Sequence, residues 1–235
     1  KEPQMVENSN MEKDYYEPVG KWAKRSLGCF HYGIDKGLRH GRIDVIGLRD
    51  AGGRLSGRAE VVAIEVKRGN APFATSVGQA HGYSIYADRC YLADVRPTGF
   101  SEAERSIAMR LGVGLIQISG TDRVRITEVV TAPVGEPLEG LRLEVIEKLD
   151  YSLCTVCRSL FKRGDGGKWG GQVVRQGSRG RHLAKAAEEE KGIVYWLDAQ
   201  AERGGTAAAN DTIYHRRYLC PDCVRALFGG AAASD

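Results

Sequence analysis

The segment RAEVVAIEVKR, residues 58–68, decides how this sequence of 235 residues is interpreted. Its apolar residues form a run of strand length, and an acid and a lysine, Glu65 and Lys67, come near its end. Because successive side chains of a strand point to opposite faces, Glu65 and Lys67 share one face, while Ile64 and Val66 point to the other, buried face. The pattern predicts either a solvated, charged strand end or a site built at the tip of a buried strand.

The neighbouring segments alternate between strand and helix patterns. Residues 41–50, GRIDVIGLRD, predict a strand that pairs with residues 58–68 in a hairpin around the glycine-rich turn AGGRLSG. Three segments have helical patterns: 14–27, 71–88 and 101–112, the last opened by a capping box of Ser101 and Glu104. Further strands are predicted at 89–95, 113–119 and 123–130. This order predicts an α/β fold with a mixed sheet flanked by helices.

The pattern along the chain divides it into five parts. We expect a flexible leader at 1–12, the α/β domain at 13–140, a connecting helix at 141–150, a small zinc-binding domain with a basic insert at 151–228, and a disordered tail at 229–235.

Composition excludes some classes of protein. Hydrophobic residues make up 42% of the chain and charged residues 27%, which is ordinary for a globular protein. The longest apolar runs are of strand length, so no membrane span is predicted. The polar N-terminal residues show no secretory signal, and we expect a cytoplasmic protein of prokaryotic type.

Two carboxylates at the tip of the hairpin are candidate ligands for a hard metal ion. Asp44 lies in the first strand, and it would face Glu65 if the sheet bends near Gly47 or the turn. Together with the backbone carbonyl of Val66, these carboxylates suit Mg²⁺ or Mn²⁺. Lys67 is the candidate to position or deprotonate a water molecule, or to stabilise developing negative charge. The pattern therefore predicts metal-assisted hydrolysis of a phosphodiester.

These residues resemble the signature of the PD-(D/E)XK nuclease superfamily. The signature is matched by Asp44 in RIDVIG and by Glu65 and Lys67 in IEVKRG; Glu17 matches a helical acid, and Gln79 and Tyr83 match the QxxxY of RecB-like members. Residue 43 is isoleucine where the named motif has proline. The resemblance covers about residues 13–130.

The resemblance implies a restriction-endonuclease-like fold and a divalent-metal-dependent nuclease. It implies catalytic roles for Asp44, Glu65, Lys67, Glu17 and Gln79, contact of Tyr83 with nucleic acid, and DNA as the preferred partner. Restriction or defence against mobile elements is the expected setting, by analogy. Two alternatives stay open: a Holliday-junction or repair nuclease, which would be a homodimer, and a catalytically silent, zinc-dependent nucleic-acid-binding protein. Membership of a larger defence complex is a further partner expectation.

Four of the six cysteines form two CxxC pairs, CTVC and CPDC. The candidate ligands are Cys154, Cys157, Cys220 and Cys223. Each pair can offer two thiolates to one tetrahedral ion, and the second pair opens a helical pattern, which resembles a treble-clef zinc finger. A redox dithiol is the alternative, against which the duplication of the motif argues. The pattern predicts a structural Zn²⁺.

The segment between the cysteine pairs is basic. From Arg158 to Lys185 it carries eight lysines and arginines and a single acid, Asp165. Such a segment either contacts nucleic acid or is a solvated loop. The candidate nucleic-acid-binding residues here and beside the second pair are Lys162, Arg163, Lys168, Trp169, Arg175, Arg179, Arg181, Arg216 and Arg217.

Overall fold

The computed structural model describes residues 11–52, 58–120, 124–162, 172–174, 193–196 and 216–228. The chain folds into two compact units. The first unit holds the described residues within 1–47, 62–84 and 88–135, and the second holds those within 48–61, 85–87 and 136–235.

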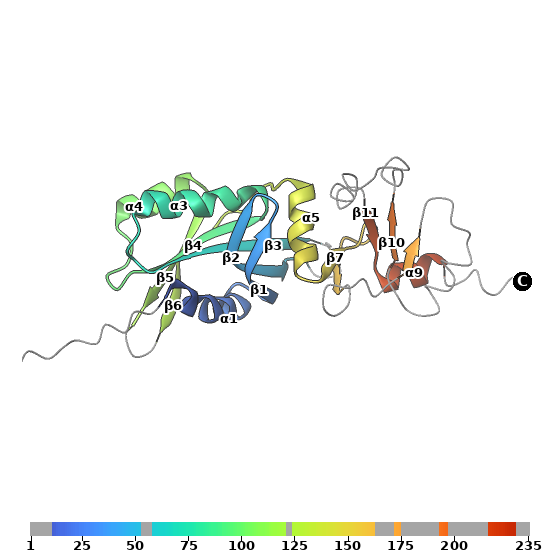
Figure 1. Cartoon of the computed structure of the whole chain (residues 1–235), viewed down its shortest axis with the longest axis horizontal. Helices are drawn as coiled ribbons and strands as arrows, with labels where there is room; N and C mark the ends of the chain where they lie inside the picture. The colour runs from blue at the N-terminus through green and yellow to red at the C-terminus, as the bar shows by residue number, and fades with distance from the viewer. Residues whose placement is uncertain are drawn as a thin grey trace, which may run out of the picture. The chain divides into compact units, whose positions relative to one another are not determined.

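A six-stranded mixed sheet has its strands in sequence order, β1 to β6 (Figure 1). The strands are β1 (Cys29–Leu38), β2 (Gly41–Asp50), β3 (Ala59–Lys67), β4 (Arg89–Val95), β5 (Val113–Ser119) and β6 (Arg125–Val130). β3, β4 and β5 run parallel, and β6 runs antiparallel to β5. The links before β2 and β3 are too short for a parallel crossover, so β1, β2 and β3 form an antiparallel meander.

Helices cover both faces of this sheet (Figure 1). They are η1 (Glu12–Tyr15), α1 (Tyr16–Ser26), α3 (Phe73–Gly82), η2 (Tyr83–Ile85) and α4 (Glu102–Arg110). Val19 and Trp22 of α1 pack with Ile64 and Val66 in one buried cluster. Val77 and Ala80 of α3 pack on the other face in a second cluster that includes Leu92 and Leu115. Because side chains alternate along β4 and β5, these two strands contribute residues to both clusters, one on each side of the sheet.

The predicted α/β fold with a mixed sheet and flanking helices is confirmed. β4 and β5 have the predicted bounds, and the capping box is present, with the Glu104 amide donating to Ser101 Oγ at 3.3 Å. The predicted helix at 71–88 was too long, because α3 ends at Gly82 and the 3-10 turn η2 follows. The face of β3 that carries Glu65 is buried as well, since helices pack on both faces and Glu65 is only 4% exposed.

β1 and η1 were not predicted. The burial of β1 is only partial over most of its length, so its sequence lacks the apolar run that marks an inner strand. Residues 11 and 12, which fall at the end of the expected flexible leader, are described in the structure, and Glu12 begins η1.

The second unit contains the far end of the β2–β3 hairpin and the cysteine pairs. Its elements are α5 (Glu139–Lys148), β7 (Tyr151–Leu153), β8 (Leu160–Lys162), β9 (Gln172–Val174), β10 (Ile193–Trp196), β11 (Arg216–Leu219) and α9 (Pro221–Phe228). Arg142, buried on α5, donates a hydrogen bond to the carbonyl of Ala59. Tyr218 of β11 donates to Glu147 of α5 at 2.6 Å. β10 pairs with β9 and β11.

Among the described residues, no helix is long and apolar enough to cross a membrane.

Candidate active site and metal centre

A cluster of acids surrounds Lys67 where β3 ends; we call Glu12, Asp44, Glu65 and Lys67 the carboxylate cluster. Asp44 comes from the middle of β2, Glu65 and Lys67 from the end of β3, and Glu12 from η1. The cluster is assembled by pairing of adjacent strands and by packing of the first helical turn, since its members are separated by up to 55 residues of sequence.

Asp44 accepts one hydrogen bond at each carboxylate oxygen. Tyr16 donates to Oδ1 at 2.8 Å, and the amide of Val66 donates to Oδ2 at 2.9 Å. Asp44 is 8% exposed. Its carboxylate therefore takes a β3 backbone donor and is fixed beside the segment that carries Glu65 and Lys67.

Glu65 is held on both sides. Lys67 Nζ lies 2.5 Å from Glu65 Oε1, and the Tyr83 hydroxyl donates to Glu65 Oε2; the same hydroxyl lies 2.9 Å from the carbonyl oxygen of Arg42. Lys67 Nζ also lies 3.6 Å from Glu12 Oε1. The Lys67 side chain is 13% exposed, and its ammonium group lies between two carboxylates.

The electrostatics of the cluster follow from burying several charges together. Burial and the neighbouring charge of Asp44 raise the pKa of Glu65, although Lys67 and Tyr83 oppose this shift. Burial acts to lower the pKa of Lys67, but the hydrogen bond and charge of Glu65 outweigh it, so the pKa of Lys67 is raised. Burial and the hydrogen bonds to carboxylates raise the pKa of Tyr16 and of Tyr83, so both hydroxyls stay protonated donors.

Sequence reasoning missed Glu12, a member of the cluster, and Tyr16, which donates to Asp44. They lie four residues apart, and the Tyr16 hydroxyl also lies 3.4 Å from Glu12 Oε1. The sequence did contain a signal for both residues. Val19 and Ala23 lie on the buried face of the predicted helix, and the same helical spacing, continued towards the N-terminus, places Tyr16 three residues before Val19 and Glu12 four residues before Tyr16.

Glu17, the acid expected at the metal, has other partners. It accepts a hydrogen bond from Tyr32 at 2.9 Å and lies 3.3 Å from Lys21 Nζ. Its side chain is 50% exposed, and these partners lower its pKa. Because residues 16 and 17 are about 100° apart around a helix, Tyr16 meets Asp44 while Glu17 points elsewhere. Of these two neighbours, Tyr16 is the one that the structure places at the carboxylate cluster.

The remaining predicted contacts fall in three groups. Tyr83 lies at the carboxylate cluster, whereas Gln79 is exposed on α3. Lys162 is exposed at the end of β8. Arg163, Lys168, Trp169, Arg175, Arg179 and Arg181 lie outside the described residues, as do the side chains of Arg216 and Arg217.

The four cysteines of the two CxxC pairs come together and form a site that can bind a metal ion such as zinc. We call Cys154, Cys157, Cys220 and Cys223 the cysteine cluster; their sulfur atoms all lie within 4.8 Å of one another. The carboxylate donors of the other cluster suit hard cations, whereas four sulfurs suit zinc.

Backbone pairing positions the two halves of the cysteine cluster. Cys154, which follows β7, forms a bridge with Tyr218 of β11, and the amide of Thr155 donates to the Tyr218 carbonyl at 2.8 Å. Two amides point at sulfur: Cys220 N donates to Cys154 Sγ and Cys223 N to Cys220 Sγ, each at 3.4 Å. Amide donors of this kind stabilise thiolate charge.

The thiols differ in acidity. Although burial acts to raise it, hydrogen bonds from Ser159 and neighbouring thiols lower the pKa of Cys157 to about 7. Burial raises the pKa of Cys220 to about 11. Cys157 Sγ lies 2.8 Å from Ser159 Oγ. Of these two thiols, Cys157 therefore loses its proton more readily than Cys220.

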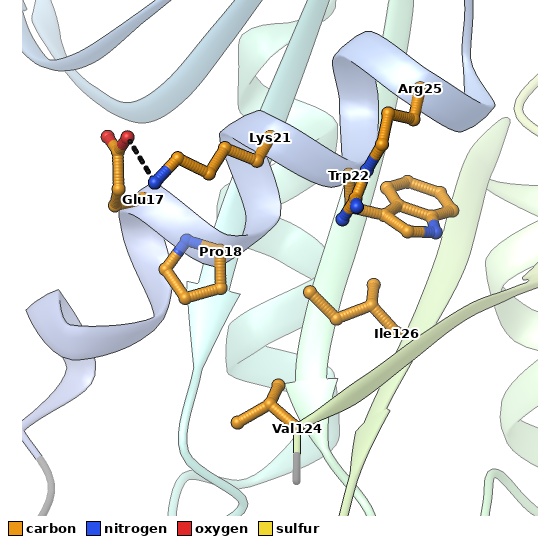
Figure 2. Close-up of a pocket in the computed structure, with 7 residues that line it drawn as sticks. All are labelled: Glu17, Pro18, Lys21, Trp22, Arg25, Val124 and Ile126. Atoms are coloured by element: carbon orange, nitrogen blue, oxygen red, sulfur yellow. Dashed lines mark ion pairs between the residues drawn. The ribbon is translucent and has the colours of Figure 1, made fainter.

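A separate pocket lies between α1 and the start of β6 (Figure 2). It has a volume of about 380 Å³, and we call it the α1–β6 pocket. It is lined by Glu17, Pro18, Lys21, Trp22, Arg25, Val124 and Ile126.

Comparisons with known proteins give no identity for the chain. No family model matches it, and no curated protein or solved structure is significantly similar to it.

Proposed function

We propose that this protein is a divalent-metal-dependent nuclease that hydrolyses phosphodiester bonds of DNA. The observation that supports the proposal most is the convergence of Asp44, Glu65 and Lys67 from two strands into one buried cluster. The preference for DNA, and a role in restriction or defence against mobile elements, follow from the resemblance to the PD-(D/E)XK nucleases.

The donor set fits a hard divalent cation. Asp44 and Glu65 would hold Mg²⁺ or Mn²⁺, and the Val66 carbonyl is the expected third donor. Each carboxylate oxygen accepts one described hydrogen bond or ion pair and retains a second lone pair for a ligand. The bound cation would polarise a phosphoryl oxygen and favour ionisation of water.

The electrostatics of Lys67 favour one of its expected roles. Because the pKa of Lys67 is raised, the side chain carries a positive charge at neutral pH. Its ion pairs with Glu65 and Glu12 hold that charge beside the carboxylates. Lys67 is therefore suited to stabilise negative charge on a phosphate oxygen or to orient water, more than to remove a proton. Tyr16 and Tyr83 fix the two acids.

For the cysteine cluster we propose structural zinc. Four sulfur ligands leave no coordination position open on a tetrahedral ion, which is the arrangement of structural sites. The module around it would support binding of nucleic acid.

The test is cleavage of plasmid DNA by the purified full chain with Mg²⁺ or Mn²⁺. We expect the wild type to nick or linearise the plasmid and Lys67→Ala to lose at least about a hundredfold in rate, as removal of a charge-stabilising group does. Arg68→Ala, an exposed neighbour, is the matched control and should cleave like the wild type. Intact DNA with every metal would contradict the proposal.

A second function is favoured by the cysteine cluster: a zinc-dependent nucleic-acid-binding protein with a silent nuclease fold. Stoichiometric zinc and DNA binding without cleavage in the same assay would support it.

A further inference from the structure

The α1–β6 pocket combines an apolar floor with a cationic rim (Figure 2). Pro18 and Trp22, four residues apart on α1, and Ile126 on β6 provide flat and branched apolar surface. Lys21 and Arg25, also four residues apart, provide two cations on the same helix. Its volume of about 380 Å³ lies within the range of roughly 300–1,000 Å³ usual for ligand pockets.

The charge of the rim is not balanced by the described protein. Glu17 lies 3.3 Å from Lys21 and also accepts a hydrogen bond from Tyr32. Arg25 is exposed and makes no ion pair with any residue in the described ranges. The lining thus carries one acid against two cations, and the uncompensated cation is an arginine. Guanidinium groups bind phosphate through paired donors and stack on aromatic rings.

Neighbouring residues of α1 contact the carboxylate cluster and line the pocket. Tyr16, the first residue of α1, donates to Asp44, and the next residue, Glu17, begins the lining of the pocket.

We propose that the α1–β6 pocket binds an unpaired nucleotide of the substrate strand. The base would lie against Pro18, Trp22 and Ile126, and its phosphate would bind Arg25 and Lys21. The inference rests on the proposed function in one respect: the strand in the pocket is the one that is cut. It predicts preference for single-stranded or unpaired DNA.

The test measures binding without cleavage. A labelled single-stranded oligodeoxynucleotide is titrated with the full chain in the Glu65→Gln background, with no added divalent metal, and anisotropy is recorded. We expect Arg25→Glu to weaken binding at least about tenfold, which corresponds to about 1.4 kcal/mol. Lys24→Glu is the matched control: it changes the charge equally at an exposed position outside the pocket, and about twofold weakening is expected.

A second variant gives a change of opposite sign. Glu17→Gln removes the acid that pairs with Lys21, so the proposal predicts tighter binding of the single strand, by about two- to threefold. Circular dichroism checks that each variant is folded.

Several outcomes would overturn the proposal: equal weakening by Arg25→Glu and Lys24→Glu, equal or tighter binding of the matching duplex, or binding of a free mononucleotide without binding of the strand. These outcomes are separate from failure of the nuclease proposal. Arg25-dependent binding with no cleavage by the wild type would support the pocket proposal and contradict the nuclease proposal. Cleavage without Arg25-dependent binding would contradict the pocket proposal alone.

Discussion

The carboxylate cluster and the cysteine cluster are built in different ways. The carboxylate cluster depends on the pairing of β2 with β3 and on one helical turn, and its charges are held by Tyr16, Tyr83 and a backbone amide. The cysteine cluster is made from two CxxC turns, each local in sequence, joined by a backbone bridge. In the carboxylate cluster, negative charge is offset by Lys67 and by hydrogen-bond donors of the protein, whereas four thiolates would need a bound cation to offset their charge.

The largest effect is expected from loss of a cysteine ligand. Cys220→Ser should abolish stoichiometric zinc and unfold the module that contains α9, because zinc binding is worth about 10 kcal/mol or more in small modules. Metal analysis and hydrogen exchange would measure both. Cys29→Ala, at a buried cysteine of β1 outside the cysteine cluster, should keep its zinc. A zinc-free Cys220→Ser variant with unchanged protection in the module would contradict this assignment.

A smaller effect is expected from loss of the buried cation. Lys67→Met leaves Glu65 without its ion-pair partner, and should lower the free energy of unfolding by about 3 kcal/mol in urea denaturation without metal. Arg68→Met, at an exposed position, should change it by less than about 0.5 kcal/mol. Added Mg²⁺ should restore part of the loss in Lys67→Met. Equal stability of the two variants would show that the cluster is not held together by charge.

Tyr16 fixes Asp44 through one hydrogen bond. Tyr16→Phe should lower the free energy of unfolding by about 1.5 kcal/mol, the contribution of a hydrogen bond to a charged group, and should weaken Mn²⁺ binding. The matched control is Tyr15→Phe, because the Tyr15 ring packs beside the same core. If both variants bind Mn²⁺ as the wild type does, Tyr16 does not position a metal ligand.

The smallest expected effect is on the pH dependence of the free energy of unfolding, for which the two acids below predict slopes of opposite sign. The pKa of Glu65 is raised by burial and by Asp44, so the unfolded chain ionises first and Glu65 destabilises the fold as pH rises above about 4.5. Glu65→Gln should remove this decline. Glu104 should have the opposite effect. Burial acts to raise its pKa, but hydrogen bonds from Ser101 outweigh burial and lower the pKa, so the stabilisation that ionised Glu104 gives the fold is lost as pH falls.

Urea titrations of Glu65→Gln, Glu104→Gln and the wild type between pH 4 and pH 8 would measure these differences. If Glu65→Gln shows the same slope as the wild type across this range, the acid is not buried against Asp44.

The sequence predicted the elements whose signals are local. β4 and β5 are short apolar runs, and their bounds were predicted to the residue. β1 gave no such signal, because most of its residues are partly exposed and Asp35 within it has a positive φ of 53°. Asp44, Glu65 and Lys67 were proposed from a motif. Glu12 and Tyr16 lie on an extension of the helical pattern, and their contacts with Lys67 and Asp44 were found only in the folded structure.

The cysteine cluster was the easier site to predict. The spacing of a CxxC motif alone brings its two sulfur atoms close together. Only the approach of the first pair, at Cys154, to the second, at Cys220, depended on the three-dimensional fold. The choice between Glu12 and Glu17 shows the limit of pattern matching. A motif locates an acid on the first helix, whereas the helical rotation decides which acid meets Lys67.

The proposed function requires that Asp44 and Glu65 bind one hard cation. Electron paramagnetic resonance of Mn²⁺ titrated into the zinc-loaded full chain tests it most directly. The account predicts one Mn²⁺ per chain in the wild type, at least about tenfold weaker binding in Asp44→Asn, and unchanged binding in Asp50→Asn, at an exposed position of the same strand. Equal Mn²⁺ affinity in Asp44→Asn and the wild type would contradict a metal site at Asp44 and Glu65.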